Sequence, residues 1–393
     1  MGNQGSSSQE LGVKLENDTT VTWKKVTSCS FPLREGQCAC SQGNNMYVFG
    51  GVINDGENHI ESCELLKFNV VDLTWTLIDA KGTLPEPLSA ASLVSVGNKL
   101  YLFGGLNQET GWQDSLYVFD TDTSTWSKID GEGKKPSARD KLQGCVMDSC
   151  IYYFGGFGPQ LTGDEDDEDW EDMDDSDDDV IDEAKTQKAA QFGWFNDLYS
   201  FDTATNKWSQ PMHMNLGVPK ARAAHGMCSV GRNLLIFGGR DTEKRTNDLH
   251  IFNVDTRKWE LDMKINGERP VARSFHTATA VGKRMVVMGG RGQDNNHLAD
   301  FHIFDTETKE WMQPEVLGDT PEARGQHCVA VVGDKLVMYG GTSHFNTETM
   351  MCSKLHGDTY VLQIADVLKG QAIHTDNTQG NNTNDTQTNG STS

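Results

Sequence analysis

Short apolar runs that end in a pair of glycines recur along the chain. Each run contains four residues, as at 46–49, 100–103 and 234–237. Runs of this length, rich in valine, isoleucine and aromatic side chains and stopped by glycine, are typical of buried β-strands. A second apolar run follows after a polar loop, and a tryptophan stands seven residues beyond its end, as in 249–259. The pattern predicts a series of small antiparallel sheets.

The pattern repeats six times with a period close to 51 residues. The glycine pairs begin at residues 50, 104, 155, 238, 289 and 340, and six tryptophans follow the same spacing. One interval, between the third and fourth copies, is about 32 residues longer in both series. A period near fifty with a glycine pair and a later tryptophan is the kelch pattern, in which each repeat forms one propeller blade. We therefore expect an all-β, six-bladed kelch propeller with four strands per blade.

The closure of the propeller can also be predicted. The last copy contains three predicted strands, at 326–332, 336–339 and 359–364, but no tryptophan follows them. Trp23, by contrast, precedes the first glycine pair. The N-terminal strand should therefore complete the last blade, which leaves no open sheet edge.

The propeller is predicted to span 18–368, between a flexible leader at 1–17 and a disordered polar tail at 369–393. The long interval corresponds to an insertion loop at 158–193 in the third blade. In its central part, 164–183, 15 of 20 residues are acidic, and the whole chain has a net charge of −23. Such a segment cannot bury enough apolar surface to fold. The overall acidity, without a basic stripe, argues against nucleic acid as a partner.

The composition also indicates the compartment. Nine cysteines at irregular spacings fit a reducing environment, and neither a signal peptide nor a membrane-spanning run is recognised. We expect the protein in the cytoplasm, with the nucleus as the alternative. Gly2 fits the N-myristoylation pattern, although a plain flexible leader would look the same. A single acyl chain would give at most a weak membrane contact.

No cofactor, metal ion or catalytic function is predicted. The chain lacks a Gly-x-Ser-x-Gly elbow and a phosphate-cradling loop. Cys38 and Cys40 are expected to be core residues of a strand, with a zinc site as the alternative. Histidines recur at one position in three copies, so we interpret them as scaffold, with a metal ion at the channel as the alternative. They are His225, His276 and His327.

The six copies allow an internal comparison, because a residue that recurs in most blades is expected to be structural. An arginine 16 residues before the first glycine of the pair recurs in five copies, and Leu88 replaces it in the second. By this test the recurring arginines are scaffold: Arg34, Arg139, Arg222, Arg273 and Arg324.

Residues that do not recur, on loops at the channel face, are candidates for function. Arg240 and Arg291 directly follow their glycine pairs, and Arg245 lies in the same loop as Arg240. Lys141 and Ser274 begin the inner strands of the third and fifth blades. Together these residues would form a basic pocket that binds a carboxylate through arginine forks and a hydroxyl. The alternative is that each arginine pairs with an acidic loop neighbour: Asp241, Glu243 or Asp294.

Several motifs resemble the kelch domain-containing C-degron receptors. They lie at 139–142, 153–156, 193–197, 219–225, 237–250 and 273–276. The resemblance implies a six-bladed propeller that binds the free C-terminus of a protein, typically ending in diglycine. It also implies that the bound protein is presented to a cullin-2 ubiquitin ligase.

The resemblance further implies roles for individual residues. Arg240, Arg245 and Ser274 match the clamp on the terminal carboxylate, and Lys141 matches a contact to the peptide backbone. Three phenylalanines match aromatic positions of the pocket wall, to which the internal comparison adds Arg291. They are Phe157, Phe195 and Phe275.

The chain departs from the family pattern at some positions. Val52 and Gln326 occupy two further aromatic positions, and no helices that would recruit elongin and cullin are recognised after Leu368. We expect a propeller that binds the C-terminal carboxylate of partner proteins or short peptides, as a substrate receptor for ubiquitination. A kelch scaffold without a ligase link, and an iron enzyme of the specifier-protein type, are the alternative hypotheses. A separate hypothesis is that the acidic insertion occupies the basic pocket as a pseudo-ligand, with a solubilising spacer as the alternative.

Overall fold

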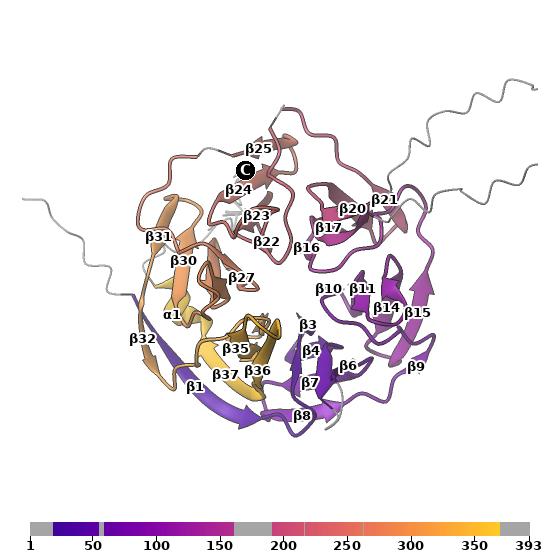
Figure 1. The fold of residues 1–393 in the computed structure, drawn as a ribbon, viewed down its shortest axis with the longest axis horizontal. Coiled ribbons are helices and arrows are strands. Elements are labelled where there is room, and N and C mark those ends of the chain that lie inside the picture. Colours follow the sequence, from indigo (N-terminus) through magenta and orange to yellow (C-terminus); the bar gives the residue numbers. More distant parts are fainter. Residues whose placement is uncertain (1–18, 55–58, 161–190, 216, 262, 370–393) are drawn as a thin grey trace, which may run out of the picture.

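Six sheets, each built on four antiparallel strands, surround a central axis (Figure 1). The computed structural model describes residues 19–54, 59–160, 191–215, 217–261 and 263–369. In each blade the strands pair antiparallel and follow one another in sequence order from the axis outwards, except that β1 supplies an outer strand of the last blade. The predicted all-β propeller with six blades is confirmed.

Each blade runs from an inner strand at the axis to an outer strand at the rim. The first blade contains β3 (Cys38–Gln42), β4 (Asn45–Phe49), β7 (Leu65–Asn69) and β8 (Thr74–Leu77). The second contains β10 (Ser92–Val96), β11 (Lys99–Phe103), β14 (Leu116–Asp120) and β15 (Thr125–Ile129). The third contains β16 (Gln143–Met147), β17 (Cys150–Phe154), β20 (Leu198–Asp202) and β21 (Lys207–Ser209).

The other three blades have the same order. The fourth contains β22 (Gly226–Val230), β23 (Asn233–Phe237), β24 (Leu249–Asn253) and β25 (Lys258–Glu260). The fifth contains β27 (Thr277–Val281), β28 (Arg284–Met288), β30 (Phe301–Asp305) and β31 (Glu310–Met312). The sixth contains β33 (Cys328–Val332), β34 (Lys335–Tyr339), β37 (Asp358–Gln363) and β1 (Thr20–Ser28).

Shorter strands occur in the connections. Two of them extend an outer strand in parallel: β9 (Lys81–Gly82) beside β15 and β32 (Glu315–Gly318) beside β1. The others form small ribbons on the loops after the glycine pairs or before the inner strands. These are β2 (Arg34–Glu35), β5 (Val52–Asn54), β6 (His59–Glu61), β12 (Leu106–Asn107), β13 (Gly111–Trp112), β18 (Phe157–Gln160), β19 (Gln191–Trp194), β26 (Arg273–Ser274), β29 (Arg291–Gly292), β35 (Thr342–Asn346) and β36 (Met351–Leu355).

The N-terminal strand closes the ring, as predicted. β1 pairs antiparallel with β37, where Lys24 lies opposite Val361, and its Trp23 is only 2% exposed. The strand expected at 359–364 ends at Gln363, because the chain turns there into the short helix α1 (Ile364–Leu368). In the described ranges no helix combines the length and the apolar character that crossing a membrane requires.

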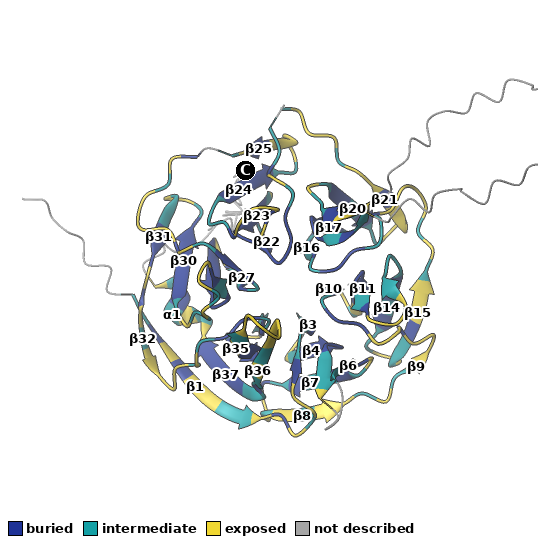
Figure 2. Cartoon of the chain, viewed as in Figure 1, coloured by how far each residue is buried: buried dark blue, intermediate teal, exposed yellow. Residues whose placement is uncertain are grey.

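The hydrophobic core lies between neighbouring blades. The second strand of a blade is buried along most of its length, because adjacent blades cover both of its faces, whereas the outer strands are more exposed (Figure 2). Most of the recurring tryptophans pack on an aromatic ring of the preceding blade. The ring pairs are Phe49–Trp126, Phe103–Trp208, Phe154–Trp259, Phe237–Trp311 and Tyr339–Trp75, with centroids 4.3–5.7 Å apart.

The recurring arginines are structural, as predicted. Each donates from Nη1 to the carbonyl oxygen of the first glycine of its own glycine pair, over 2.9–3.2 Å. Each also pairs with a carboxylate at the start of the third strand; Arg222, for example, holds both oxygens of Asp248 at 2.7 and 2.8 Å. The arginine therefore ties the inner loop of a blade to the two strands beyond it.

Replacing Gly105 with alanine is expected to lower the free energy of unfolding by about 2–5 kcal/mol. Its φ is +105°, and a Cβ there would lie 2.9 Å from the Cβ of Ala91 and 3.0 Å from the carbonyl oxygen of Ser89. Gly97, in the same blade, has φ +61°, and a Cβ added to it would meet no atom within 4 Å, so Gly97→Ala should cost only about 1 kcal/mol. Chemical denaturation of both variants measures the difference; equal losses would contradict the steric explanation.

Several predicted segments lie outside the described residues. They are the leader at 1–17 with Gly2, the acidic stretch 164–183 and the tail from residue 370. Of the predicted insertion loop, 158–160 and 191–193 belong to the hairpin of β18 and β19.

Candidate functional site

A ring of backbone hydrogen bonds surrounds one end of the central channel. Six residues, one per blade, stand two positions after the recurring arginine, or after Leu88 in the second blade, and all have φ between +53° and +66°. Five hydrogen bonds connect them in sequence order: the backbone N–H of each residue donates to the carbonyl oxygen of the corresponding residue in the preceding blade, over 2.7–2.9 Å. The six residues are Gly36, Ala90, Lys141, Ala224, Phe275 and Gln326. Because the ring fixes their backbone, their side chains and the neighbouring loops form a rigid rim, which we call the channel mouth.

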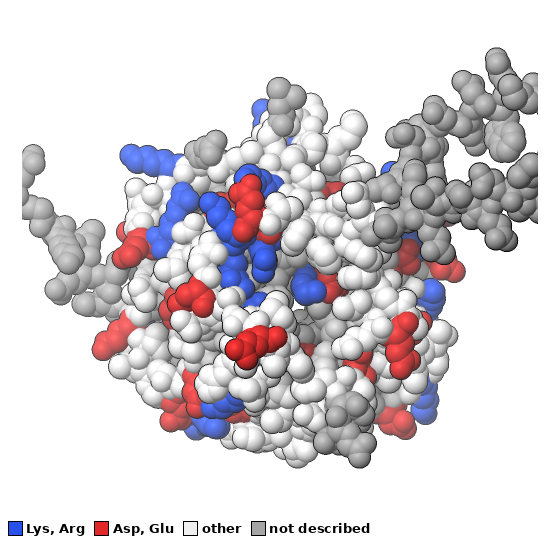
Figure 3. Space-filling view, in the orientation of Figure 1, with Lys and Arg blue, Asp and Glu red and all other residues white. Residues whose placement is uncertain are grey.

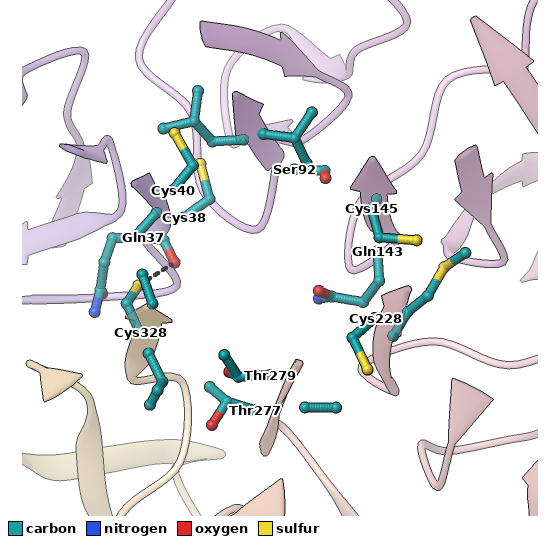
Figure 4. Close-up of a pocket in the computed structure, with 18 of the residues that line it drawn as sticks. Gln37, Cys38, Cys40, Ser92, Gln143, Cys145, Cys228, Thr277, Thr279 and Cys328 are labelled. Carbon is teal, nitrogen blue, oxygen red and sulfur yellow. Dashed lines mark hydrogen bonds between the residues drawn. The ribbon is translucent and has the colours of Figure 1, made fainter. Parts of the chain in front are cut away.

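The channel below the mouth is a cavity of about 420 Å³ lined by the inner strands. Figure 4 shows Cys38, Cys40 and Cys328 on one side of it and Cys145 and Cys228 on another. Burial raises the pKa of all five thiols, so they stay protonated and are poor metal ligands. Cys38 and Cys40 are buried on β3, as expected. No group of three metal-ligating side chains occurs in the described part of the chain.

The recurring histidines are packed into the scaffold. His225 and His327 are buried, and burial lowers the pKa of each to about 3. The ring of His225 packs edge-on against Phe154, and that of His276 against Phe237. They therefore serve as neutral core residues between blades.

Arg245 is the best-anchored cation at the mouth. Its side chain is buried; Nε donates to Ser274 Oγ, Nη1 to the carbonyl oxygen of Gly292 and Nη2 to Oδ1 of Asn295, each over 2.9 Å. Burial, together with the nearby charges of Arg291 and Arg240, lowers the pKa of Arg245 to about 10. The structure thus places Arg240, Arg245 and Ser274 close together, while their binding role stays a prediction.

Arg240 and Arg291 are two further arginines of this region. The backbone of Arg240 bridges to that of Arg245, and its side chain is exposed. The guanidinium of Arg291 lies 5.3 Å from the ring centre of Phe275 and 3.9 Å from that of Phe345. Within the described residues no carboxylate lies within ion-pair distance of Arg240, Arg245 or Arg291. Figure 3 shows basic side chains gathered beside the centre of this face.

The acidic loop neighbours make other bonds. Asp241 accepts the backbone N–H groups of Glu243 and Lys244 at 2.8 and 2.7 Å. Asp294 accepts both the backbone and the side-chain N–H of Asn296. Neither Asp241 nor Asp294 thus comes within ion-pair distance of these arginines in the described part of the chain, although the charge of Asp294 acts on Arg245 at longer range.

Two predicted site residues have partners of their own. Lys141 lies on the mouth but forms an ion pair with the buried Asp140. Phe195 stacks on the recurring Arg139, with the guanidinium 3.8 Å from the ring centre. Both side chains are thus held by residues of their own blade, and they are less available to a ligand than expected.

The remaining wall positions lie at the mouth. Phe157 bridges to Asp140 and packs against Trp194 and Trp112, with ring centres 4.9 and 6.0 Å apart. Phe275 carries one link of the backbone ring and contacts Arg291.

Two residues of the mouth, Phe345 and Glu35, were not predicted from the sequence. Phe345 comes from the sixth blade and stacks on Arg291 of the fifth, a contact that no sequence spacing indicates. Glu35 directly follows a recurring arginine, the position that Ser274 holds in its own blade. The comparison of repeats that found Ser274 could therefore have found Glu35.

The chain matches a family described as the KLHDC2/KLHL20/DRC7 Kelch-repeats domain, over residues 2–173 and 185–367. It is 33% identical over 322 residues to Kelch domain-containing protein 1 of Homo sapiens, covering 80% of this chain and 77% of the relative. Kelch domain-containing protein 2 of Bos taurus is 30% identical, with 79% and 76% covered. Kelch domain-containing protein 3 of Bos taurus is 28% identical, with 79% and 78% covered. None of these names states an enzymatic activity.

Proposed function

The chain belongs to the kelch-repeats domain family, whose propellers bind partner proteins, and we propose that its channel mouth binds the C-terminal carboxylate of partner peptides. One observation carries the proposal: three arginines gather around a buried serine, and within the described residues no carboxylate comes within ion-pair distance of them, while Asp294 and Glu35 act on them only at longer range. Like charges that lower one another's pKa repel, and a bound anion relieves that repulsion.

The donors left free at the mouth fit a carboxylate. Arg245 uses three of its five N–H groups on protein acceptors and retains two. Ser274 accepts from Arg245, so its own hydroxyl hydrogen can be donated to a ligand. Arg240 retains its whole guanidinium. Charge-assisted bonds of this kind are worth about 1.5–3 kcal/mol each.

A chain end suits the mouth better than an internal acidic side chain does. The backbone ring is rigid, and only one strand of a C-terminal peptide has to leave it. With an internal Asp or Glu, the chain on both sides of that residue would have to leave through the same opening.

A link to a cullin-2 ubiquitin ligase is part of the proposal and depends on the family resemblance. We expect elongin and cullin 2 to co-purify with the tagged full-length chain. Recovery of peptide partners without either protein would favour a scaffold role instead.

Arg240→Ala is expected to weaken binding of a C-terminal peptide about tenfold, because it removes one charge-assisted bond. The measurement is a titration of a labelled peptide as free acid and as C-terminal amide. Arg232→Ala is the matched control, since Arg232 is an exposed arginine that pairs with Asp148 and Asp255 away from the mouth. Equal affinity of acid and amide for the unmodified protein would reject the proposal.

A further inference from the structure

Glu35 adds an acidic group to the mouth, opposite in charge to the arginines. It lies on β2 beside Gly36 of the backbone ring and is partly buried. The electrostatic neighbours of its carboxylate are His59 and Arg291. The mouth therefore carries both signs of charge within reach of one short ligand.

Strand β35 links the two charged regions. Its first residue, Thr342, lies beside the Glu35 carboxylate, and its fourth, Phe345, stacks on Arg291. A strand rises about 3.3 Å per residue, so the backbone positions of Thr342 and Phe345 are about 10 Å apart along it. This sets the scale of the separation between the acidic and the basic part of the mouth.

The hydrogen bonds of Glu35 are incomplete. Gln326 donates from Nε2 to Oε2 over 3.3 Å, which is long for such a bond. The hydroxyl of Thr342 also lies within hydrogen-bonding reach of the carboxylate, but it has a single hydrogen and donates to the carbonyl oxygen of Lys354 over 3.0 Å. No Lys or Arg in the described part of the chain lies within ion-pair distance of Glu35.

Partial burial has a cost for this carboxylate. Burial raises the pKa of Glu35, while the Thr342 side chain and the charges of His59 and Arg291 act in the opposite direction. A cation placed against Glu35 would restore part of the solvation that the carboxylate has lost.

We propose that Glu35 selects ligands that carry a lysine or arginine within the last three residues before the terminal carboxylate. The inference rests on the proposed function, because the arginines fix the chain end from which the distance to Glu35 is counted. One or two extended residues span about 3–7 Å, and a long basic side chain covers the remainder of the 10 Å. A peptide with both charges matches the mouth in sign and in spacing.

The test uses four peptides. Two sequences differ only in having lysine or alanine two residues before the end, and each is prepared as the free acid and as the amide. The unmodified protein should bind the lysine acid about tenfold more tightly than the alanine acid. In Glu35→Gln this ratio should fall below about twofold, because the amide keeps the shape without the charge. Glu348→Gln, at an exposed acid in the turn of the β35–β36 ribbon, is the matched control and should keep the ratio.

A second comparison needs no variant. Acetylating the peptide lysine keeps its length and removes its charge, and it should abolish the advantage over alanine. An unchanged lysine-to-alanine ratio in Glu35→Gln, or an acetyl-lysine peptide as tight as the lysine peptide, would overturn the inference. Failure of the proposed function is a different result: acid and amide would then bind equally, whatever the residue upstream.

Discussion

Arg222→Met is expected to lower the free energy of unfolding by about 3–5 kcal/mol. Arg222 is fully buried and donates to the carbonyl oxygen of Gly238 over 2.9 Å and to both oxygens of Asp248. Methionine fills the space but leaves the carbonyl and the carboxylate without their donor. Removing one partner of a buried ion pair costs more than the pair itself contributes. Denaturant unfolding at pH 7 measures the loss.

Arg232→Ala provides the control for this prediction. Arg232 has more ion-pair contacts than most residues of the chain, with Asp148 and Asp255, but its side chain is 44% exposed. Exposed ion pairs contribute little to stability, because solvent screens the attraction and ordering two long side chains costs entropy, so this variant should unfold almost as the unmodified protein does. If both substitutions cost the same, burial is not what makes the recurring arginine important.

The second blade shows how the arginine can be absent. Leu88 stands in its place and is buried. Leu116 pairs with Phe103 as Leu249 pairs with Phe237, so Ser115 occupies the position that Asp248 holds in the fourth blade. The arginine and the carboxylate are thus lost together, and neither charge of the pair is left buried alone. Leu88 is therefore not evidence that the other arginines are dispensable.

The fold could be predicted from the sequence because each recurring residue meets a requirement that few others satisfy. The glycine pairs have positive φ, the tryptophans fill the gap to the preceding blade, and the arginines bond the first glycine of their pair. Such requirements recur with the blade and so leave a period in the sequence. The turn from β37 into α1 occurs in one blade only, so the repeat does not indicate it. The strand predicted at 359–364 therefore ends one residue early, at Gln363.

The charged site was only partly predictable. Position in the repeat indicated Arg240, Arg245 and Ser274, but it could not show which cations keep a free charge. Lys141 is paired with the adjacent Asp140, whereas Arg240 is not paired with the adjacent Asp241. The difference arises because the Asp241 carboxylate is already satisfied by backbone N–H groups of its own loop. Such competition between acceptors depends on loop conformation, which local sequence does not specify.

Arg245→Ala is expected to weaken binding of a C-terminal peptide by between about tenfold and 100-fold, the largest effect of any single change at the mouth. Arg245 contributes charge to the site and also positions the Ser274 hydroxyl, 2.9 Å from its Nε. Alanine removes both contributions. Lysine keeps the charge, but it lacks the planar fork that reaches Ser274, Gly292 and Asn295 together, so Arg245→Lys should restore only part of the affinity.

The substitution also loosens the protein, and the two effects can be separated. Arg245 is buried, and its loss leaves the carbonyl of Gly292 and the side chain of Asn295 without a donor. A loosened mouth weakens the acid and the amide of a peptide equally. A lost contact to the terminal carboxylate weakens only the acid, so the acid-to-amide ratio should shrink towards one in Arg245→Ala. If the ratio is preserved while both affinities fall, Arg245 acts by holding the loop in place and the carboxylate is bound by other residues of the mouth.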